Sequence, residues 1–288
     1  MRRLIITADD FGAAYEVNEA VERAHCRGVL TAASLMVTGA AAQDAIVRAR
    51  RMPSLRVGLH VVLVEGRPVL PASEVSHLVD ASGMFRSDMA MLGAAIFFNS
   101  AARRQVAAEI AAQFAAFLAT GLPLDHCNAH KHFHLHPVIG GLIADIGMRY
   151  GLRAVRVPVE PRRVLRKVEQ PTPWTPASLT APFGLMLRRR LDGAGLLTPD
   201  HVFGLQWSGH MTEKRLVGLI RNAPPGLSEI YLHPATGPFV GSAPGYAYRA
   251  EMEALLSEAV RTACRDSAAS RGGFSDFCGA QTESLSAY

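Results

Sequence analysis

Residues 4–28, LIITADDFGAAYEVNEAVERAHCRG, contain the pattern that indicates the fold class of this chain. The apolar run at 4–8 predicts a buried strand, and residues 16–27 then carry apolar side chains at helical spacing on one face. Gly28 follows as the expected end of that helix. A strand followed directly by such a helix is half of a βα unit, from which parallel sheets are built.

Further βα units follow along most of the chain. Repeated units of this kind predict an α/β fold with a parallel sheet, either open or closed into a barrel, and with right-handed crossovers. A length of 288 residues with 49% hydrophobic residues suits one such domain as well as two. Strands are expected at 32–37, 55–63, 128–136, 153–157, 202–207 and 229–232, and helices at 41–51, 101–120, 138–150, 212–222 and 246–262.

Three segments interrupt this alternation. Residues 65–99 and 158–199 are irregular insertions with several prolines, and each contains an apolar run, at 89–98 and at 182–187. Loops of this length in a compact domain usually serve as lids or binding loops, although both apolar runs also suit ordinary core helices. The tail at 267–288 is rich in serine and glycine and is expected to be flexible unless its two phenylalanines dock.

The composition argues against several classes of protein. The formal charge of +5 comes from scattered basic residues without interleaved aromatics, so nucleic-acid binding is not expected, whereas an anionic membrane surface is a suitable partner. The cysteines form no C-x-x-C pair, and the first residues leave no room for the apolar region of a signal peptide. The longest apolar run is about half of what a membrane helix needs. A cytoplasmic protein is expected, with at most peripheral contact with the inner membrane.

Titratable residues gather where the predicted strands end. Asp9 and Asp10 close the first strand, His60 ends the third, and His233 follows the last. In parallel α/β folds the carboxyl ends of the strands meet at one edge, and active sites form there. Taken singly, the aspartates also suit a helix N-cap, His60 a buried core position and His233 a turn.

The stretch 128–137, NAHKHFHLHP, places a histidine at every second position from His130 to His136. An extended strand would direct all four side chains to one face and spread them along roughly 20 Å. A single tetrahedral ion can therefore contact only one or two of them. The others are expected to orient ligands, contact a substrate or fill space.

One aspartate and two histidines at neighbouring strand ends are the ligand types of a Zn²⁺ ion that keeps an open position for water. The set contains no cysteine, so Mg²⁺ or Mn²⁺ also suits it. A histidine close to this set but outside it, such as His233, is a candidate general acid. The chain contains no G-x-S-x-G, G-x-G-x-x-G or P-loop motif, which argues against a serine hydrolase and against nucleotide chemistry.

Together, ITADDFG at 6–12, GLH at 58–60, H-x-H-x-H from His130 and LHP at 232–234 resemble the YdjC-like carbohydrate deacetylases, over nearly the whole chain. The stretch 128–137 is most similar to the hopanoid-biosynthesis branch of that family. Many relatives have an aspartate where this chain has Asn128. This difference fits the hopanoid branch and argues against a chitooligosaccharide substrate.

The resemblance implies one domain over residues 1–288, folded as a distorted (β/α) TIM-like barrel, and one divalent metal ion. It also implies a role for each of the site residues. These are Asp9 as general base, His233 as general acid, Asp10, His60 and His130 as metal ligands, and His132, His134 and Asn128 as residues that orient ligands or contact the sugar.

The implied reaction removes an acetyl group from an N-acetylglucosamine-type sugar. The expected substrate is an N-acetylglucosaminyl hopanoid, which is a glycolipid. Two alternatives stay open: a deacetylase of soluble N-acetylated oligosaccharides, and a sugar- or lipid-binding protein that has kept the fold without catalysis.

Overall fold

The structure is a computed structural model that describes residues 1–170 and 176–279, and for residues 176–180 the backbone alone. Its centre is a seven-stranded sheet in which all paired strands run parallel. The strands are β1 (Arg2–Phe11), β2 (Ala32–Leu35), β3 (Arg56–Val61), β4 (Cys127–Ala129), β5 (His201–Phe203), β6 (Gly226–Leu232) and β7 (Ser270–Arg271). Their order is β4-β3-β2-β1-β6-β5, and β7 pairs with the first residues of β1.

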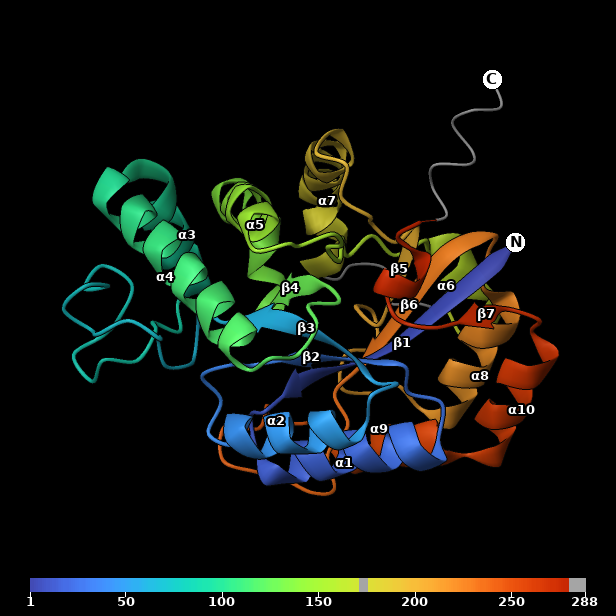
Figure 1. Cartoon of the computed structure of the whole chain (residues 1–288). Helices are drawn as coiled ribbons and strands as arrows, with labels where there is room; N and C mark the ends of the chain where they lie inside the picture. Colours follow the sequence, from blue (N-terminus) through green and yellow to red (C-terminus); the bar gives the residue numbers. More distant parts are fainter. Residues whose placement is uncertain (171–175, 280–288) are drawn as a thin grey trace.

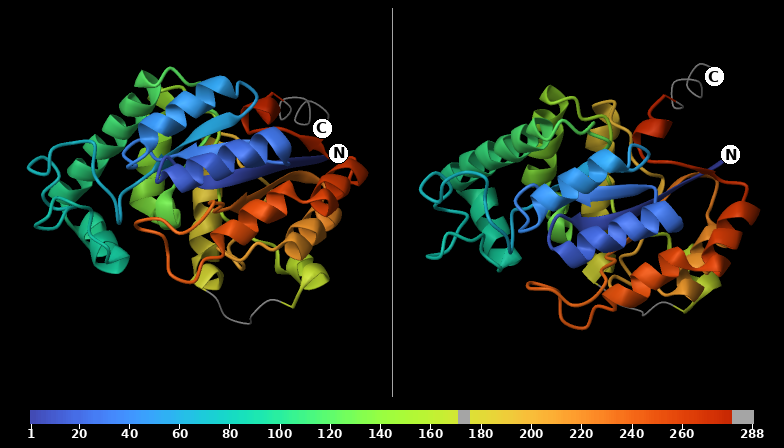
Figure 2. Two further views of the ribbon diagram at one scale, coloured as in Figure 1. Left: turned by 90° about the horizontal axis from the view of Figure 1, so that it is seen from below. Right: turned by 60° about the horizontal axis from the view of Figure 1, so that its bottom comes forward.

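Helices surround this curled sheet (Figures 1 and 2). The helices α1, α2 and α9 cover one side, α8 and α10 pack beside them, and α4, α5 and α7 stand on the other side (Figure 1). Their bounds are α1 (Tyr15–Arg27), α2 (Ala42–Arg51), α3 (Met89–Phe98), α4 (Ser100–Ala119), α5 (Pro137–Arg149), α6 (Arg162–Val168), α7 (Pro176–Gly193), α8 (Glu213–Asn222), α9 (Tyr248–Leu256) and α10 (Glu258–Asp266). The predicted α/β class is confirmed: the chain is a single domain with a distorted, partly closed TIM-like barrel.

The central strand β1 is buried on both faces, as its nearly continuous apolar sequence predicts. Leu4 and Ile6 pack into the main core, while Ile5 belongs to a second, smaller cluster that contains Phe274 and Phe277. Because side chains alternate along a strand, the residues on the side of Ile5 are those that line the inside of the barrel. This inner side becomes polar toward the carboxyl end of β1.

The histidine-rich stretch does not form the predicted strand. β4 ends at Ala129, and His130–Leu135 form a 3₁₀ turn in which Lys131 and His132 have φ values of 52° and 55°. Left-handed residues cannot continue an extended strand, so the four alternate histidines do not share one face. The strand expected at 153–157 is likewise reduced to isolated bridges with β4 and with Leu197.

The segments that interrupt the βα alternation are partly helical. The apolar run 89–98 is helix α3, and the region 158–199, expected to be irregular, contains α6 and α7. Residues 270–277 pack against the sheet, with Phe274 fully buried, while 280–288, the end of the tail expected to be flexible, lie outside the described residues. Among the residues that the structure describes, none of the helices has the length and apolar character needed to cross a bilayer.

Candidate active site

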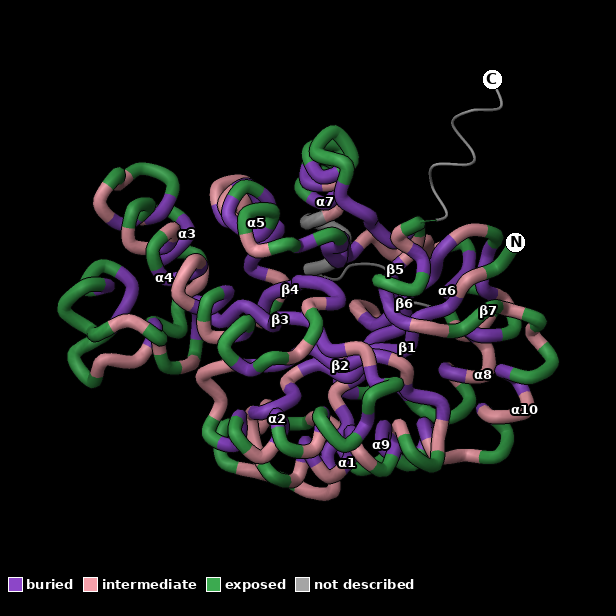
Figure 3. Tube along the Cα trace, viewed as in Figure 1, coloured by how far each residue is buried: buried purple, intermediate pink, exposed green. Residues whose placement is uncertain are grey.

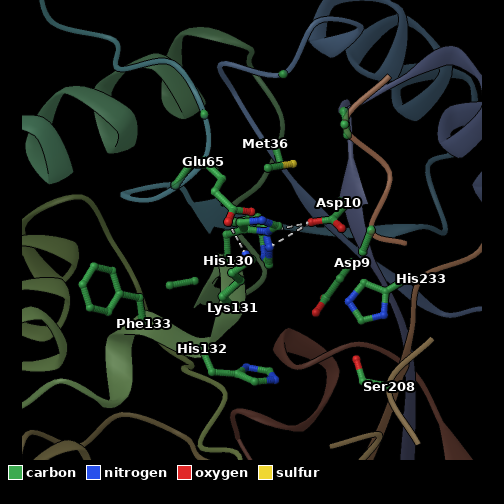
Figure 4. Close-up of a pocket in the computed structure, with 18 of the residues that line it drawn as sticks. Asp9, Asp10, Met36, Glu65, His130, Lys131, His132, Phe133, Ser208 and His233 are labelled. Carbon is green, nitrogen blue, oxygen red and sulfur yellow. Dashed lines mark hydrogen bonds and ion pairs between the residues drawn. The ribbon is translucent and has the colours of Figure 1, made fainter. Parts of the chain in front are cut away.

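A cavity of about 1220 Å³ opens at the carboxyl ends of the strands (Figure 4). Asp9, Asp10, His60 and His233, which stand at or after the ends of predicted strands, line it together with His130. Two adjacent residues of a regular strand would point to opposite faces. Here Asp10 has φ 62°, and the pairing of β1 with β2 shifts register just before Phe11, so both carboxylates reach the cavity.

Asp10, His60 and His130 form the tightest group of ligand-type side chains in the cavity. One oxygen of Asp10, Oδ1, lies 3.2 Å from His60 Nε2 and 3.1 Å from His130 Nδ1. The three candidate ligand atoms all lie within 4.8 Å of one another, which suits coordination of one ion. Although burial raises the pKa of Asp10, the two histidines more than offset this and hold that pKa well below its ordinary value.

The hydrogen bonds around His60 prepare it as a ligand. His60 Nδ1 lies 2.6 Å from the side-chain oxygen Oδ1 of Asn128, which can only accept, so Nδ1 carries the proton. Nε2, which faces Asp10, is then the ring nitrogen left to bind an ion. A histidine whose second nitrogen donates to a fixed acceptor is the usual arrangement in metal sites, so the group fits a divalent ion.

Asp9 is held by an ion pair that the sequence did not reveal. Arg156 Nη1 lies 2.5 Å from Asp9 Oδ2, and Nη2 lies 2.9 Å from Oδ1. The same guanidinium donates to Glu229, with Nε 3.0 Å from both carboxylate oxygens, and its Cζ lies 4.5 Å from the centre of the Tyr231 ring. Burial alone would raise the pKa of Asp9, but Arg156, with His60 and His233, holds it far below its ordinary value. Asp9 is therefore ionised at neutral pH.

His233 follows β6 and enters the cavity beside Asp9 (Figure 4). Its backbone N–H donates to Glu251 Oε2 at 2.5 Å, and its ring lies 5.3 Å from that of Tyr246. The ring atom Nδ1 is buried and has no hydrogen-bond partner among the described residues. A buried ring nitrogen without a partner is a group that a substrate can engage.

The family of the chain follows from comparison with known sequences. The sequence profile described as "YdjC-like protein" matches residues 3–266. The chain belongs to the YdjC-like family. A carbohydrate deacetylase of Brevibacillus brevis is 32% identical over 234 residues, which are 81% of each chain. A carbohydrate deacetylase of Mus musculus is 33% identical over 77% of this chain and 72% of its own.

A solved structure supports the fold of this YdjC-like chain. A protein of Enterococcus faecalis V583, with a provisional assignment to cellobiose-phosphate cleavage, superposes with a TM-score of 0.75. The alignment covers 96% of this chain and 98% of the other, at 23% sequence identity. Similarity at this level of identity shows that the two proteins share the fold.

The other histidines of the YdjC-like motif have separate surroundings. His132 Nε2 lies 2.9 Å from the Tyr231 hydroxyl, and His134 Nε2 donates to the Arg156 carbonyl at 3.0 Å. Burial lowers the pKa of His132 well below its ordinary value and that of His134 to about 3, so both rings are neutral. His136 packs against the rings of Phe97 and Phe133, each 6.2 Å away. In this structure, His134 therefore supports Arg156, whereas His132 lines the cavity.

Sequence reasoning missed Arg156, which pairs with Asp9, and Glu229, which pairs with Arg156. Both lie within short, mostly apolar runs, RAVRV and SEIYL. A charged residue in such a run is usually interpreted as lying on the solvent-exposed face of a strand. The available signal was that both runs were predicted to be strands of a parallel sheet, whose faces are both covered. A charged side chain in such a strand must find a partner inside the barrel.

Proposed function

We propose that this YdjC-like protein is a metal-dependent N-deacetylase that removes an acetyl group from an N-acetylglucosamine-type sugar. The observation that carries the proposal is the close placement of three metal-ligand side chains, an ionised aspartate and a histidine with a free ring nitrogen in one cavity. The relatives named carbohydrate deacetylases support the reaction class.

Asp10, His60 and His130 would hold the ion. Zn²⁺ is the first choice for one carboxylate and two imidazoles, with Mg²⁺ or Mn²⁺ as alternatives. A divalent ion at this position supplies Lewis-acid activation of water and of the acetamide carbonyl. Asn128 contributes indirectly, because it fixes the tautomer of His60.

Asp9 is the proposed general base and His233 the proposed general acid. Arg156 keeps Asp9 ionised, so its carboxylate is ready to accept a proton from the attacking water. The same ion pair makes Asp9 a poor place for that proton to stay, which favours its onward transfer. His233 lies beside Asp9 and would protonate the departing amine, which is otherwise a poor leaving group (Figure 4).

We further propose that the sugar is carried by a lipid, with an N-acetylglucosaminyl hopanoid as the substrate. The cavity is larger than a single sugar needs, and many of the side chains that line it are apolar. These apolar lining residues include Met84, Met89, Phe133, Phe183, Phe239 and Val240. An apolar ring system attached to the sugar would fit against these side chains.

The outer surface of two helices that border the cavity, α3 with Met89 and α7 with Phe183, supports peripheral contact with the membrane. The helices α3 and α7 both expose large apolar side chains, and the basic residue Arg189 on α7 is also exposed. Such a surface, which we call the apolar rim, suits the headgroup region of an anionic membrane. The apolar rim consists of Met91, Phe97 and Phe98 on α3 and Phe183, Leu185 and Met186 on α7.

A comparison of two substrates tests the proposed function. Acetate release is measured from N-acetylglucosaminyl hopane and from N,N'-diacetylchitobiose, with protein reloaded with Zn²⁺ or Mg²⁺. Turnover of the lipid alone is the expected result. Turnover of the soluble sugar alone would favour the second candidate, a soluble-oligosaccharide deacetylase, which the carbohydrate-deacetylase names of the relatives support. Absence of turnover with both would point to a binding protein.

A further inference from the structure

A chain of buried polar groups leads from Asp9 away from the cavity. Ser34 Oγ, on β2, lies 3.1 Å from Asp9 Oδ1 and 3.0 Å from His126 Nε2. His126 Nδ1 lies 2.8 Å from Asp125 Oδ2. All of these side chains are buried, and of them Asp9 alone lines the cavity. A serine, a histidine and an aspartate in this order resemble a catalytic triad, but a serine with no exposed surface cannot act as a nucleophile.

The far end of this chain is held by the C-terminal segment. Asp125 accepts hydrogen bonds from the backbone N–H of Phe274 at 3.1 Å and from the backbone N–H and hydroxyl of Ser275 at 2.8 and 2.5 Å. The Phe274 ring stacks on His126 with 4.3 Å between ring centres. Asp125 is therefore surrounded by donors, and the hydrogen bonds of His126 and Ser275 more than offset the rise in its pKa that burial causes.

The two carboxylates at the ends set the direction of the hydrogen bonds that they accept. Ser34 Oγ is placed to donate to Asp9 Oδ1, and it accepts from Asn128 Nδ2, which lies 2.9 Å away. His126 Nδ1 donates to Asp125, while His126 Nε2 contacts Ser34 Oγ and holds that side chain in place.

This arrangement makes the two oxygens of Asp9 unequal. Oδ1 faces three donors: Arg156 Nη2 at 2.9 Å, Ser34 Oγ at 3.1 Å and Asn128 Nδ2 at 3.3 Å. Oδ2 faces Arg156 Nη1 at 2.5 Å, its one donor among the described residues. Oδ2 is thus the oxygen with a lone pair left to accept a proton.

We propose that Ser34, His126 and Asp125 are positioning residues that hold Oδ1 of Asp9, so that Oδ2 is presented to the attacking water. Asp125 is in turn fixed by residues 274–275, which makes the C-terminal segment part of the support of the active site. This inference rests on the proposed role of Asp9 as general base. Ser34 and His126 act through Asp9 and do not contact the substrate.

Ser34→Ala tests the inference, with Ser228→Ala as its matched control. Both serines are fully buried in neighbouring parts of the sheet, but the hydroxyl of Ser228 has no hydrogen-bond partner among the described residues. Loss of a hydrogen bond to a charged group predicts that Ser34→Ala lowers kcat about tenfold or more, with KM nearly unchanged. Ser228→Ala should leave both constants unchanged. Equal kcat values for the two variants, at a temperature where both are folded, would overturn the inference.

A second measurement does not depend on turnover. In ¹⁵N NMR spectra, the Nε2 signal of His126, assigned with His126→Gln, should shift in Ser34→Ala and stay in place in Ser228→Ala. An unchanged Nε2 signal in Ser34→Ala would contradict the contact between Ser34 and His126. If the wild type does not release acetate, the proposed function fails, while the NMR result still decides whether the support of Asp9 exists.

Discussion

A carboxylate that serves as a base must remain ionised and must also keep one oxygen accessible, and the surroundings of Asp9 meet both requirements. Arg156 supplies the charge that keeps Asp9 ionised. Glu229 accepts hydrogen bonds from the same guanidinium, so the three residues form a buried, hydrogen-bonded network. Buried networks of this kind are costly when one member is removed, because the others are left as unpaired charges.

Replacement of the central cation should therefore destabilise the whole fold. Arg156→Met leaves Asp9 and Glu229 buried without a positive partner, and we expect a loss of about 3–5 kcal/mol in the free energy of unfolding. Arg190→Met is the control, since Arg190 pairs with Asp145 at a half-exposed site. That change should cost at most about 1 kcal/mol. Urea unfolding of the two variants makes the comparison, and equal losses would refute the importance of the buried network.

The roles of the adjacent aspartates should separate in binding and turnover. Asp9→Asn should lower kcat at least about a hundredfold and keep the metal site, because Asp9 is outside the ligand group. Asp10→Ala should abolish both turnover and metal binding. A metal at about 100 times its dissociation constant stabilises a protein by about 2.7 kcal/mol, so a thermal shift on addition of Zn²⁺ reports binding. A fully active Asp9→Asn enzyme would remove Asp9 from the base role.

At the scale of elements, short irregular connections place the site residues more than the helices do. The turn after β4 separates His130, His132 and His134 into three environments through two residues with positive φ. The loop before α8 has a similar role on the other side of the cavity, where Tyr246 packs against both His233 and Gly209. Close contacts of this kind allow backbone geometry to set the position of a catalytic side chain.

Gly209→Ala should disturb the acid side of the active site. Gly209 has φ 74°, and an added Cβ would lie 2.2 Å from the Tyr246 ring, which must then move against His233. The control Gly195→Ala has nearly the same φ, 73°, and no atom within 4 Å of the added Cβ. It should cost about 1–2 kcal/mol from backbone strain alone and leave kcat unchanged. Kinetics of both variants test this, and unchanged kcat in Gly209→Ala would show that Tyr246 does not position His233.

At the scale of the whole molecule, local patterns predicted the fold class and most strand ends. The βα alternation and the strand-end residues Asp10 and His60 depend on nearby sequence. The ion pair of Arg156 with Asp9 spans 147 positions and that with Glu229 spans 73, so no local pattern could indicate it. The turn at Lys131 and His132 could not be predicted for a different reason. A histidine at every second position is also the pattern of a strand with one polar face.

Membrane contact is a property of the assembled surface and can be tested by flotation with anionic vesicles. Burial of large apolar side chains in the headgroup region contributes about 1.5–3 kcal/mol each, so Phe98→Ser with Leu185→Ser should lower binding by at least tenfold. Val47→Ser is the control, because Val47 is exposed on α2, a helix that lies across the sheet from α3 and α7 (Figure 3). Failure of the wild type to float would argue against the membrane contact.

The position of β1 has a consequence for synthesis of the chain on the ribosome. β1 carries Asp9 and Asp10, yet it pairs with β6, and its first residues pair with β7. Arg156, Glu229 and the segment that supports Asp125 must all leave the exit tunnel before the surroundings of Asp9 are complete. β1 is therefore made long before its full set of partners, and a nascent chain without residues 226–277 can pair β1 with β2 while the other edge of this apolar strand stays open. Folding of this protein is consequently expected to be post-translational, with β1 as the segment most in need of protection until then.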